Sequence, residues 1–407
     1  MNEENYAPFN FPVEDKSERI IKVIGVGGGG GNAVQHMWEE GVRNVTFIVT
    51  NTDSQVLSAN KVPNKLLLGP GLGAGGIKEE GKRIAEENID EIHKMFDDET
   101  KMVFITAGLG GGTGTGAMPV IARVAKEMGI LTIGVVTLPF RMEGRKRIFQ
   151  ALEGLEEIRR QVDSLIVINN ERLLDDEQYN TLTWEDGLKK ADEVLMTATK
   201  TVAEIITVIG MVNRDFNDVK SVMQDGGAAI VSVGTASGEN RMLRALSNAI
   251  SSSLVANVDR RRVRRMLYII YSGEKNPARI NELREINEFM DDFSEDILLL
   301  WGHYPDKTLN DEIKVAVVAS GFDEEPLPTV ENTEPNQKQK MESLFQRYYA
   351  DPVDSVSQEV DEQSEPQPEA PADEEKAEVE ERLDAKPNKF KGMLSSIMEV
   401  LNRVVDE

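Results

Sequence analysis

The chain has 407 residues, 40% of them hydrophobic, which is enough for two domains with buried cores. It contains no cysteine, which excludes disulfides and thiolate metal sites. A formal net charge of −25 speaks against a general nucleic-acid-binding protein, because phosphate backbones attract Lys and Arg. No apolar run reaches the roughly 18 residues of a membrane span, and Met1–Asp15 has no apolar signal core. A cytoplasmic protein is therefore expected.

Short apolar runs alternate with helical periodicity from residue 20 to about residue 223. The runs that predict buried strands are Ile20–Val26, Val45–Val49, Met102–Thr106, Thr132–Thr137 and Ser164–Ile168. The segments that predict helices are Ala33–Glu40, Glu79–Met95, Pro119–Lys126 and Arg147–Arg159. This alternation favours an α/β fold with a parallel, doubly wound sheet.

A long helix and a smaller module follow. Apolar residues recur at three- and four-residue steps over 187–209, which predicts one helix that could join two domains. Beyond it, Ala228–Val233, Met266–Tyr271, Ile297–Trp301 and Ile313–Ala319 predict strands, and Asn240–Ile250 and Ala278–Met290 predict helices. The sequence thus predicts a small mixed α/β domain over 210–322.

Both ends of the chain differ in composition from the middle. Residues 1–17 are expected to be disordered, and so is the segment 323–388, because Pro, Glu, Gln and Asp bury too little apolar area. Asp and Glu outnumber Lys and Arg by about 15 between residues 321 and 384, so the folded part is only mildly acidic. Residues 389–407 form a short amphipathic tail, which could be a partner helix, a membrane-surface helix or a frayed end.

A first glycine-rich loop, Gly25–Asn32, lies between a predicted strand and a predicted helix. Glycine lets the backbone approach an anion, and a helix N-terminus presents free N–H groups to phosphate. Gly25, Gly27 and Gly30 also fit the dinucleotide fingerprint, with Asp53 about 23 residues further on. Taken alone, this loop also suits a nicotinamide enzyme or a tight structural turn.

A second glycine-rich loop, Gly108–Gly116, also follows a predicted strand and precedes a helix, with Pro119 expected in the first turn of that helix. Consecutive N–H groups in such a loop form an anion nest. Two such loops at the carboxyl ends of parallel strands predict a polyphosphate lying across both. The Lys-Ser/Thr ending of a Walker loop is absent.

The segment Gly210–Asp218 offers the best candidates for hydrolytic chemistry. Asp215 and Asp218 are three residues apart, so their carboxylates can share one face of a helical turn and polarise a water. The alternative is an ordinary pair of acids at a helix N-terminus. The three histidines are scattered, and no Ser–His–Asp or Cys–His arrangement is visible.

The motif Gly110–Gly116, Gly-Gly-Gly-Thr-Gly-Thr-Gly, resembles the signature of the tubulin/FtsZ family. The first glycine loop and Asn51-Thr52-Asp53 resemble the other nucleotide loops of that family, and the resemblance runs from about residue 20 to 322. It implies a Rossmann-like, parallel-sheet GTP-binding domain at 18–186, a central helix at 187–209, and a C-terminal GTPase-activating domain at 210–322.

The same resemblance implies the roles of single residues. It assigns the phosphates to Gly28, Gly29, Gly30, Gly31, Asn32, Gly111, Gly112, Thr113 and Gly114. It assigns ribose and phosphates to Glu143 and Arg147, guanine to Asn170 and Asp192, and water activation on the neighbouring subunit's GTP to Asn213, Asp215 and Asp218. Mg²⁺ is expected with the phosphates, but no dedicated protein metal ligand is predicted.

The implied function is a GTPase that polymerises head-to-tail, hydrolyses GTP between subunits and forms the contractile ring at the bacterial division site. The tail would bind an adaptor or membrane tether, and no nucleic acid is expected as a partner. The competing interpretations are a nicotinamide oxidoreductase, a filament that does not hydrolyse, and a plasmid-segregating relative.

Three positions depart from the family pattern. Ile77-Lys78 stands where many relatives have Asn-Pro, Arg214 replaces an aliphatic residue beside the expected catalytic acids, and the tail lacks the usual Ile-Pro-x-Phe-Leu core. The effects of the first two on turnover, and the partner of the tail, stay open at this stage.

Overall fold

A computed structural model describes residues 20–42, 44–96, 98–172, 183–207, 215–250, 260–294, 296–322 and 337–349. All of these lie in one compact unit, Met1–Ala350. None of the helices in these ranges combines the length and the apolar composition that a membrane span requires. Asn213, Arg214, the N-terminal segment 1–17 and the tail 389–407 are outside the described residues.

One ten-stranded sheet runs through the unit, in the order β3-β2-β1-β4-β5-β6-β7-β10-β8-β9. The first six strands are parallel neighbours: β1 (Ile21–Val26), β2 (Thr46–Asn51), β3 (Lys65–Leu67), β4 (Met102–Gly108), β5 (Leu131–Leu138) and β6 (Ser164–Asn169). Parallel strands place all their carboxyl ends at one edge of the sheet, which is where the predicted nucleotide loops begin.

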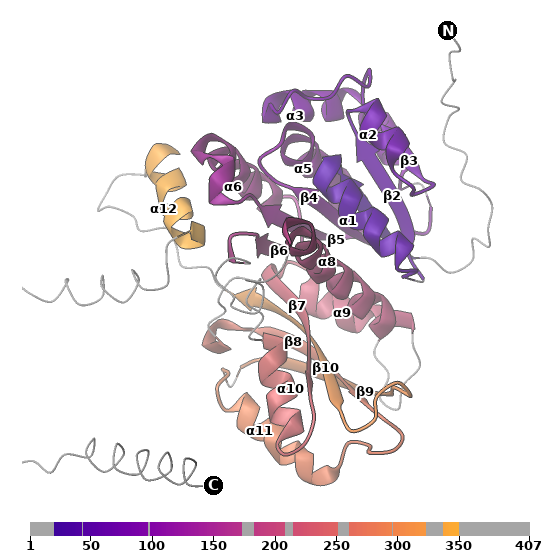
Figure 1. The fold of residues 1–407 in the computed structure, drawn as a ribbon, viewed down its shortest axis with the longest axis vertical. Coiled ribbons are helices and arrows are strands. Elements are labelled where there is room, and N and C mark those ends of the chain that lie inside the picture. Colours follow the sequence, from indigo (N-terminus) through magenta and orange to yellow (C-terminus); the bar gives the residue numbers. More distant parts are fainter. Residues whose placement is uncertain are drawn as a thin grey trace, which may run out of the picture. The chain divides into compact units, whose positions relative to one another are not determined.

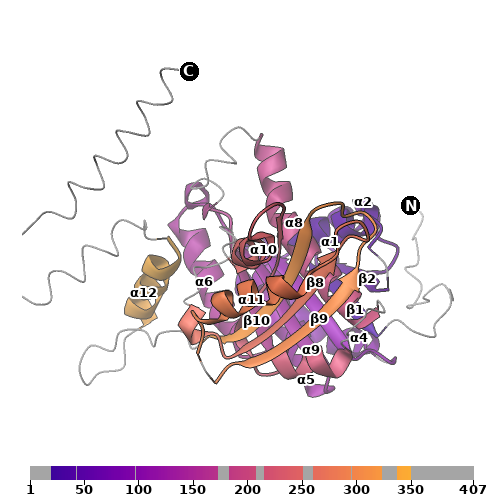
Figure 2. The same cartoon turned by 90° about the horizontal axis from the view of Figure 1, so that it is seen from below.

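Helices cover both faces of the parallel part (Figures 1 and 2). The core on one face includes α1 (Gly27–Glu39), α2 (Ser54–Ala59), α8 (Trp184–Thr207) and α9 (Phe216–Met223). The core on the other face includes α3 (Lys78–Glu87), α4 (Ile89–Lys94), α5 (Gly112–Glu127), α6 (Arg145–Arg159) and α12 (Gln337–Tyr349). Because side chains alternate along a strand, Ile21 and Val23 join the first core, while Ile24 and Val26 join the second.

The remaining strands form the second domain: β7 (Gly227–Ala236), β8 (Arg265–Ser272), β9 (Leu298–Pro305) and β10 (Ile313–Phe322). β10 is antiparallel to both β7 and β8, whereas β7 meets β6 and β9 meets β8 in parallel. With α10 (Arg241–Ile250) and α11 (Leu283–Met290) they enclose a third hydrophobic core. The predicted α/β class, with a parallel-sheet domain and a smaller mixed domain, is confirmed.

Three local expectations need correction. The helix expected over Glu79–Met95 is split into α3 and α4 at Asn88, whose side-chain Nδ2 donates to the Ile84 carbonyl. α5 begins at Gly112, so Pro119 lies inside the helix and not in its first turn. The long helix expected over 187–209 is α8, which begins at Trp184 and is described to Thr207.

α12 is the largest departure, because residues 323–388 were expected to be disordered throughout. Its 13 residues pack on α6, with Leu344 and Tyr349 buried in the second core. The prediction rested on the average composition of the segment, which hides one short run with several aromatic residues.

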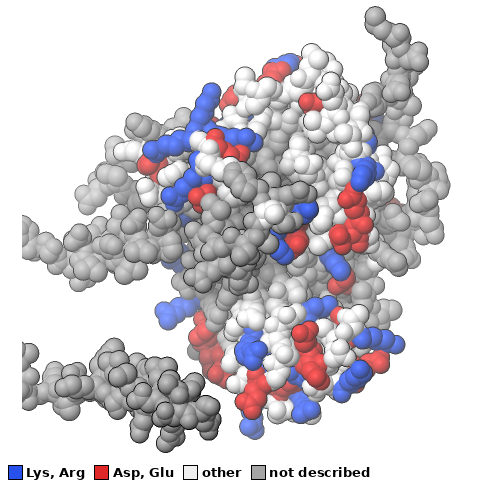
Figure 3. All heavy atoms as spheres, viewed as in Figure 1, with Lys and Arg blue, Asp and Glu red and all other residues white. Residues whose placement is uncertain are grey.

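On the face drawn in Figure 3, acidic and basic side chains are interspersed, in keeping with a folded part of modest net charge.

Candidate functional site

Two helix N-termini meet at the carboxyl edge of β1 and β4. These strands are parallel neighbours, and the glycines that follow each of them form the first turns of α1 and α5. A Cβ built on Gly27 would lie 3.0 Å from the Gly114 backbone nitrogen, so the two turns are in contact. Gly28, Gly29 and Asn32 are exposed beside this contact. The first N–H groups of a helix have no partner within the helix, so these groups and the positive ends of two helix dipoles converge on one site that suits a polyphosphate.

Close packing explains why glycine is required here. A Cβ on Gly30 would lie 2.2 Å from the Thr106 carbonyl oxygen, and one on Gly114 would lie 2.7 Å from the Gly108 carbonyl oxygen. Real Cβ atoms do not approach backbone oxygens so closely. The first turns of α1 and α5 can therefore lie against β4 only without side chains at these positions.

A third strand end joins the same place. Thr52, which follows β2, and Thr113 in the first turn of α5 share a hydrogen bond, with 2.6 Å between their hydroxyl oxygens. The next residue, Asp53, caps α2 by accepting from the Gln55 and Val56 N–H groups at 2.9 and 3.1 Å. Asp53 thus has a structural role here, which differs from the ribose contact of a dinucleotide enzyme.

The loop Gly71–Gly76 borders the second glycine turn, where a Cβ on Gly112 would lie 2.9 Å from Ala74 Cβ, and it is tied to α6. Gln150 Nε2 lies within hydrogen-bond distance of three carbonyl oxygens, those of Gly76 and Gly110 at 3.0 Å and of Gly111 at 3.2 Å. One amide group on α6 therefore connects this loop with the second glycine turn. Sequence reasoning missed Gln150, because a glutamine among other polar helix residues gives no signal.

Lys78, one of the departures from the family pattern, is buried and does not face solvent. Its ammonium nitrogen lies 3.1 Å from a Glu153 carboxylate oxygen and 2.9 Å from one of Glu157, both on α6. The lysine thereby fixes the end of the loop 71–76 to α6. Ile77 beside it is half-exposed.

Glu143 and Arg147 belong to the β5 loop (residues 139–144) and to the first turn of α6. The Glu143 carboxylate accepts from the Phe140 N–H at 2.9 Å and forms an ion pair with Arg147 at 3.0 Å. A Cβ on Gly110 would lie 2.7 Å from Arg147 Cγ, so the arginine stem is in contact with the second glycine turn. Glu143 and Arg147 are thus brought together at the edge of the site that suits a polyphosphate.

Asn170 and Asp192 come from the β6 loop (residues 170–172) and from α8. Asn170 Oδ1 is buried and accepts no hydrogen bond from any residue in the described ranges. Such an atom costs free energy unless a ligand or water satisfies it. Burial raises the pKa of the Asp192 carboxyl to about 6, an effect that the nearby His36 opposes. A carboxylate and an amide oxygen can both accept hydrogen bonds, as the edge of guanine requires.

Asp215 and Asp218 form a reciprocal cap on α9. Asp215 Oδ1 accepts from the Asp218 N–H at 3.0 Å, and Asp218 Oδ2 accepts from the Asp215 N–H at 3.1 Å. The other end of α9 is fixed by the Ser164 hydroxyl, which donates to the Met223 carbonyl at 2.6 Å. Ser164 is the first residue of β6, so this end of α9 lies at the amino edge of the sheet, opposite the glycine turns.

A metal ion would find few ligands on the protein itself. Across the described ranges, no group of three or more His, Asp or Glu side chains is placed to hold one. The hydroxyls of Thr52 and Thr113 and the backbone N–H groups are neutral. Mg²⁺, which keeps several waters and binds substrate phosphates, fits such a site as a partner of the nucleotide.

Comparison with known proteins gives matches in both domains. The profile described as Tubulin/FtsZ family, GTPase domain, matches residues 20–178, and that of the FtsZ family, C-terminal domain, matches residues 227–323. The cell division protein FtsZ of Porphyromonas gingivalis is 47% identical over 324 residues, which cover 78% of this chain and 69% of that protein.

Solved structures agree with these matches. The empty FtsZ dimer of M. jannaschii superposes with a TM-score of 0.67 at 35% identity, covering 79% of this chain and 96% of that one. CetZ1 of Haloferax volcanii, a GDP-bound monomer, gives a TM-score of 0.65 at 21% identity, covering 83% and 99%, which shows the shared fold. The chain belongs to the FtsZ branch of the tubulin/FtsZ family of GTPases.

Proposed function

We propose that this GTPase of the cell-division family binds GTP along the carboxyl edge of β2, β1, β4, β5 and β6 and completes its hydrolytic site only in a filament. The observation that most supports the binding site is the meeting of two glycine-built helix N-termini at the carboxyl edge of the sheet, the edge at which Asn170, with its buried and unsatisfied Oδ1, also follows β6. Backbone donors suit an anion, and the amide oxygen suits a base. A nicotinamide oxidoreductase is set aside by the family assignment.

The phosphates would lie over the first turns of α1 and α5. In this proposal Gly28–Asn32 and Gly111–Gly114 donate N–H groups, and the Thr113 hydroxyl adds a donor. Arg147 would exchange its ion pair with Glu143 for the phosphates, leaving the Glu143 carboxylate to accept from the ribose hydroxyls. The guanine N1–H and amino group would donate to Asp192, and the guanine edge would also satisfy Asn170.

Hydrolysis would use acids from a neighbouring subunit. Asp215 and Asp218 belong to α9, whose C-terminal end lies at the opposite edge of the sheet from the glycine turns. Head-to-tail stacking places one edge of a subunit against the other edge of the next and generates an open filament. There the carboxylates, with Asn213, would orient a water and accept its proton as it attacks the γ-phosphorus. The bond from that phosphorus to the β–γ bridging oxygen breaks, and GDP and phosphate form.

Mg²⁺, when bound, would neutralise charge on the phosphate oxygens during this step. The chain's own residues would hold the nucleotide, exclude competing waters and position the attacking one.

Outside the site, the proposal includes filament formation by this chain alone, location in the cytoplasm at the midcell ring, and an adaptor or membrane tether bound through residues 389–407.

Conservative substitutions test the assignment of the acids. Asp215→Asn keeps a good helix cap but removes the carboxylate, so α9 should stay folded while GTP turnover falls about 100-fold or more. Affinity for GTP should stay within about twofold of the parent chain. Asn217→Ala, an exposed change in the same turn, is the control. Equal loss of binding and turnover in Asp215→Asn, or turnover unchanged from the parent chain, would refute the assignment. A parent chain that binds GTP and assembles without turnover would favour a filament that does not hydrolyse.

A further inference from the structure

α12 packs on α6 as an integral part of the fold. Met341, Leu344, Tyr348 and Tyr349 are buried against α6 and its neighbours in the second core. Phe345 meets Phe149 edge-on at 6.0 Å between ring centroids and stacks on Tyr349 at 5.2 Å. Burial of these large side chains stabilises the docked helix.

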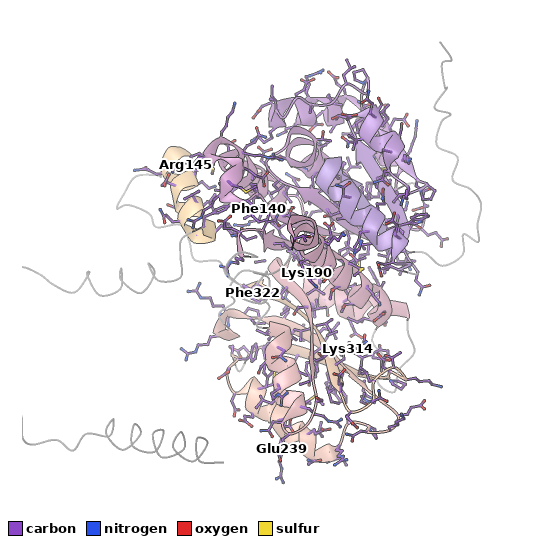
Figure 4. All side chains as sticks on the ribbon, in the orientation of Figure 1. Phe140, Arg145, Lys190, Glu239, Lys314 and Phe322 are labelled. Atoms are coloured by element: carbon purple, nitrogen blue, oxygen red, sulfur yellow. The ribbon has the colours of Figure 1, made fainter. Side chains whose placement is uncertain are left out.

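Charged groups surround this aromatic contact. Arg145, labelled in Figure 4 where α6 and α12 meet, lies over the rings of Phe149 and Phe345 at 5.3 and 5.1 Å. It also pairs with Glu342 at 2.9 Å, and Lys340 pairs with Glu156 at 2.9 Å. These contacts fix the register of α12 along α6.

The C-terminal end of α12 reaches the two loops that we assign to the guanosine. The Tyr349 hydroxyl donates to the Pro139 carbonyl at 2.6 Å, at the start of the β5 loop that holds Glu143. Asn169 Nδ2 donates to the Tyr348 carbonyl at 2.5 Å, and Asn169 is the last residue of β6, directly before the loop that holds Asn170. With its last two residues α12 thus contacts the first residue of the β5 loop and the residue that leads into the β6 loop.

The two loops are also joined directly to one another by a hydrogen bond. Glu171 in the β6 loop accepts from the Arg141 N–H of the β5 loop at 2.8 Å. Glu143 accepts from the Phe140 N–H at 2.9 Å, directly after Pro139. Burial raises the pKa of the Tyr349 phenol, and the charges of Glu171 and Glu143 raise it further, in keeping with a hydroxyl that lies beside both loops and stays protonated.

We propose that α12 is a positioning element for the nucleotide site, which holds the β5 and β6 loops at the spacing that the ribose and guanine require. Docking of α12 and binding of nucleotide then stabilise one another, because each favours the same loop arrangement. Since α12 precedes residues 350–407, a partner that pulls on that segment and undocks the helix would speed the release of GDP. This inference rests on the proposed function of Glu143 and Asn170.

The dissociation rate of GDP from the full chain tests this inference. Radiolabelled GDP would be chased with unlabelled GDP at protein concentrations below assembly. Tyr349→Phe keeps the packed ring and removes only the hydroxyl donor, and should raise the rate about three- to tenfold. Leu344→Ala should raise it at least as much, since it leaves a cavity under the helix. Gln346→Ala, at an exposed position of α12, is the matched control and should leave the rate unchanged.

A purely structural helix would not respond to nucleotide, so hydrogen exchange provides the second measurement. Saturating GDP should slow amide exchange over residues 337–349 in the parent chain, and Tyr349→Phe should remove most of that protection. Rates in both variants within twofold of the Gln346→Ala control, or amide exchange indifferent to GDP, would overturn the inference. A parent chain that binds no GDP would instead refute the proposed function.

Discussion

Asp192→Asn separates the stability of the nucleotide-free protein from its affinity for guanine nucleotide. Burial raises the pKa of this carboxyl from 3.8 to about 6, so keeping it ionised at neutral pH costs free energy of folding. At 1.36 kcal/mol per pKa unit, the cost is at most about 3 kcal/mol. Asparagine is neutral and nearly the same size. We therefore expect the nucleotide-free variant to be more stable than the parent chain at pH 7.5, by about 1–3 kcal/mol.

The pH dependence has a definite sign. A carboxyl with a raised folded pKa binds its proton more tightly in the folded state, so its stabilising contribution is complete below the unfolded value of 3.8. That contribution is lost as the pH rises through about 6. The advantage of Asp192→Asn should accordingly shrink from pH 7.5 to pH 5. Affinity of the parent chain for GDP should also fall from pH 7.5 to pH 5, as Asp192 is protonated, because guanine N–H groups need an acceptor.

Urea denaturation without nucleotide, at pH 7.5 and pH 5, measures the first effect, and calorimetric titration with GDP measures the second. Loss of hydrogen bonds to a charged acceptor should weaken GDP binding by Asp192→Asn about 10- to 100-fold at pH 7.5. Glu193→Gln, at the next position of α8, is the control and should change neither quantity appreciably. A variant that is less stable than the parent chain, or binds GDP equally well, would refute this reasoning.

Two further substitutions test the site. Gly30→Ala forces a methyl group to within 2.2 Å of the Thr106 carbonyl oxygen. We therefore expect either a loss of several kcal/mol of folding stability or a displaced α1, and weaker GTP binding in both cases. Normal stability in urea denaturation and normal affinity in GTP titration would show that the turn is not close-packed. Lys78→Met removes the cation between Glu153 and Glu157 and should therefore release the loop 71–76. In steady-state kinetics we expect the KM for GTP to rise several-fold more than kcat falls. An unchanged KM would contradict this role of Lys78.

The sequence alone predicted those parts of the fold and site that rest on apolar periodicity or on runs of glycine. Five buried apolar runs predicted five of the six strands of the parallel part, all but the three-residue β3, and the glycine pattern located the two segments to which we assign the phosphates. The pattern could not show that these glycines are already helical, because glycine in a helix is normally unfavourable. Only the packing of Gly30 and Gly114 against β4 explains their presence.

Contacts between segments distant in sequence were beyond prediction. The three carbonyls reached by Gln150 and the two glutamates reached by Lys78 depend on how α6 lies against α3 and α5. α12 was missed because its stability comes from α6 and not from its own composition. The reciprocal cap made by Asp215 and Asp218 fits the structural alternative as well as the catalytic one, so their catalytic role stays a prediction.

Phosphate release from GTP as a function of protein concentration, with ATP as the control, tests the central claim most directly. If the site is completed by a neighbouring subunit, release should be negligible below a threshold concentration and rise linearly above it, with GTP alone. A rate proportional to protein from the lowest concentration would mean that each subunit holds a complete hydrolytic site, and would contradict the account.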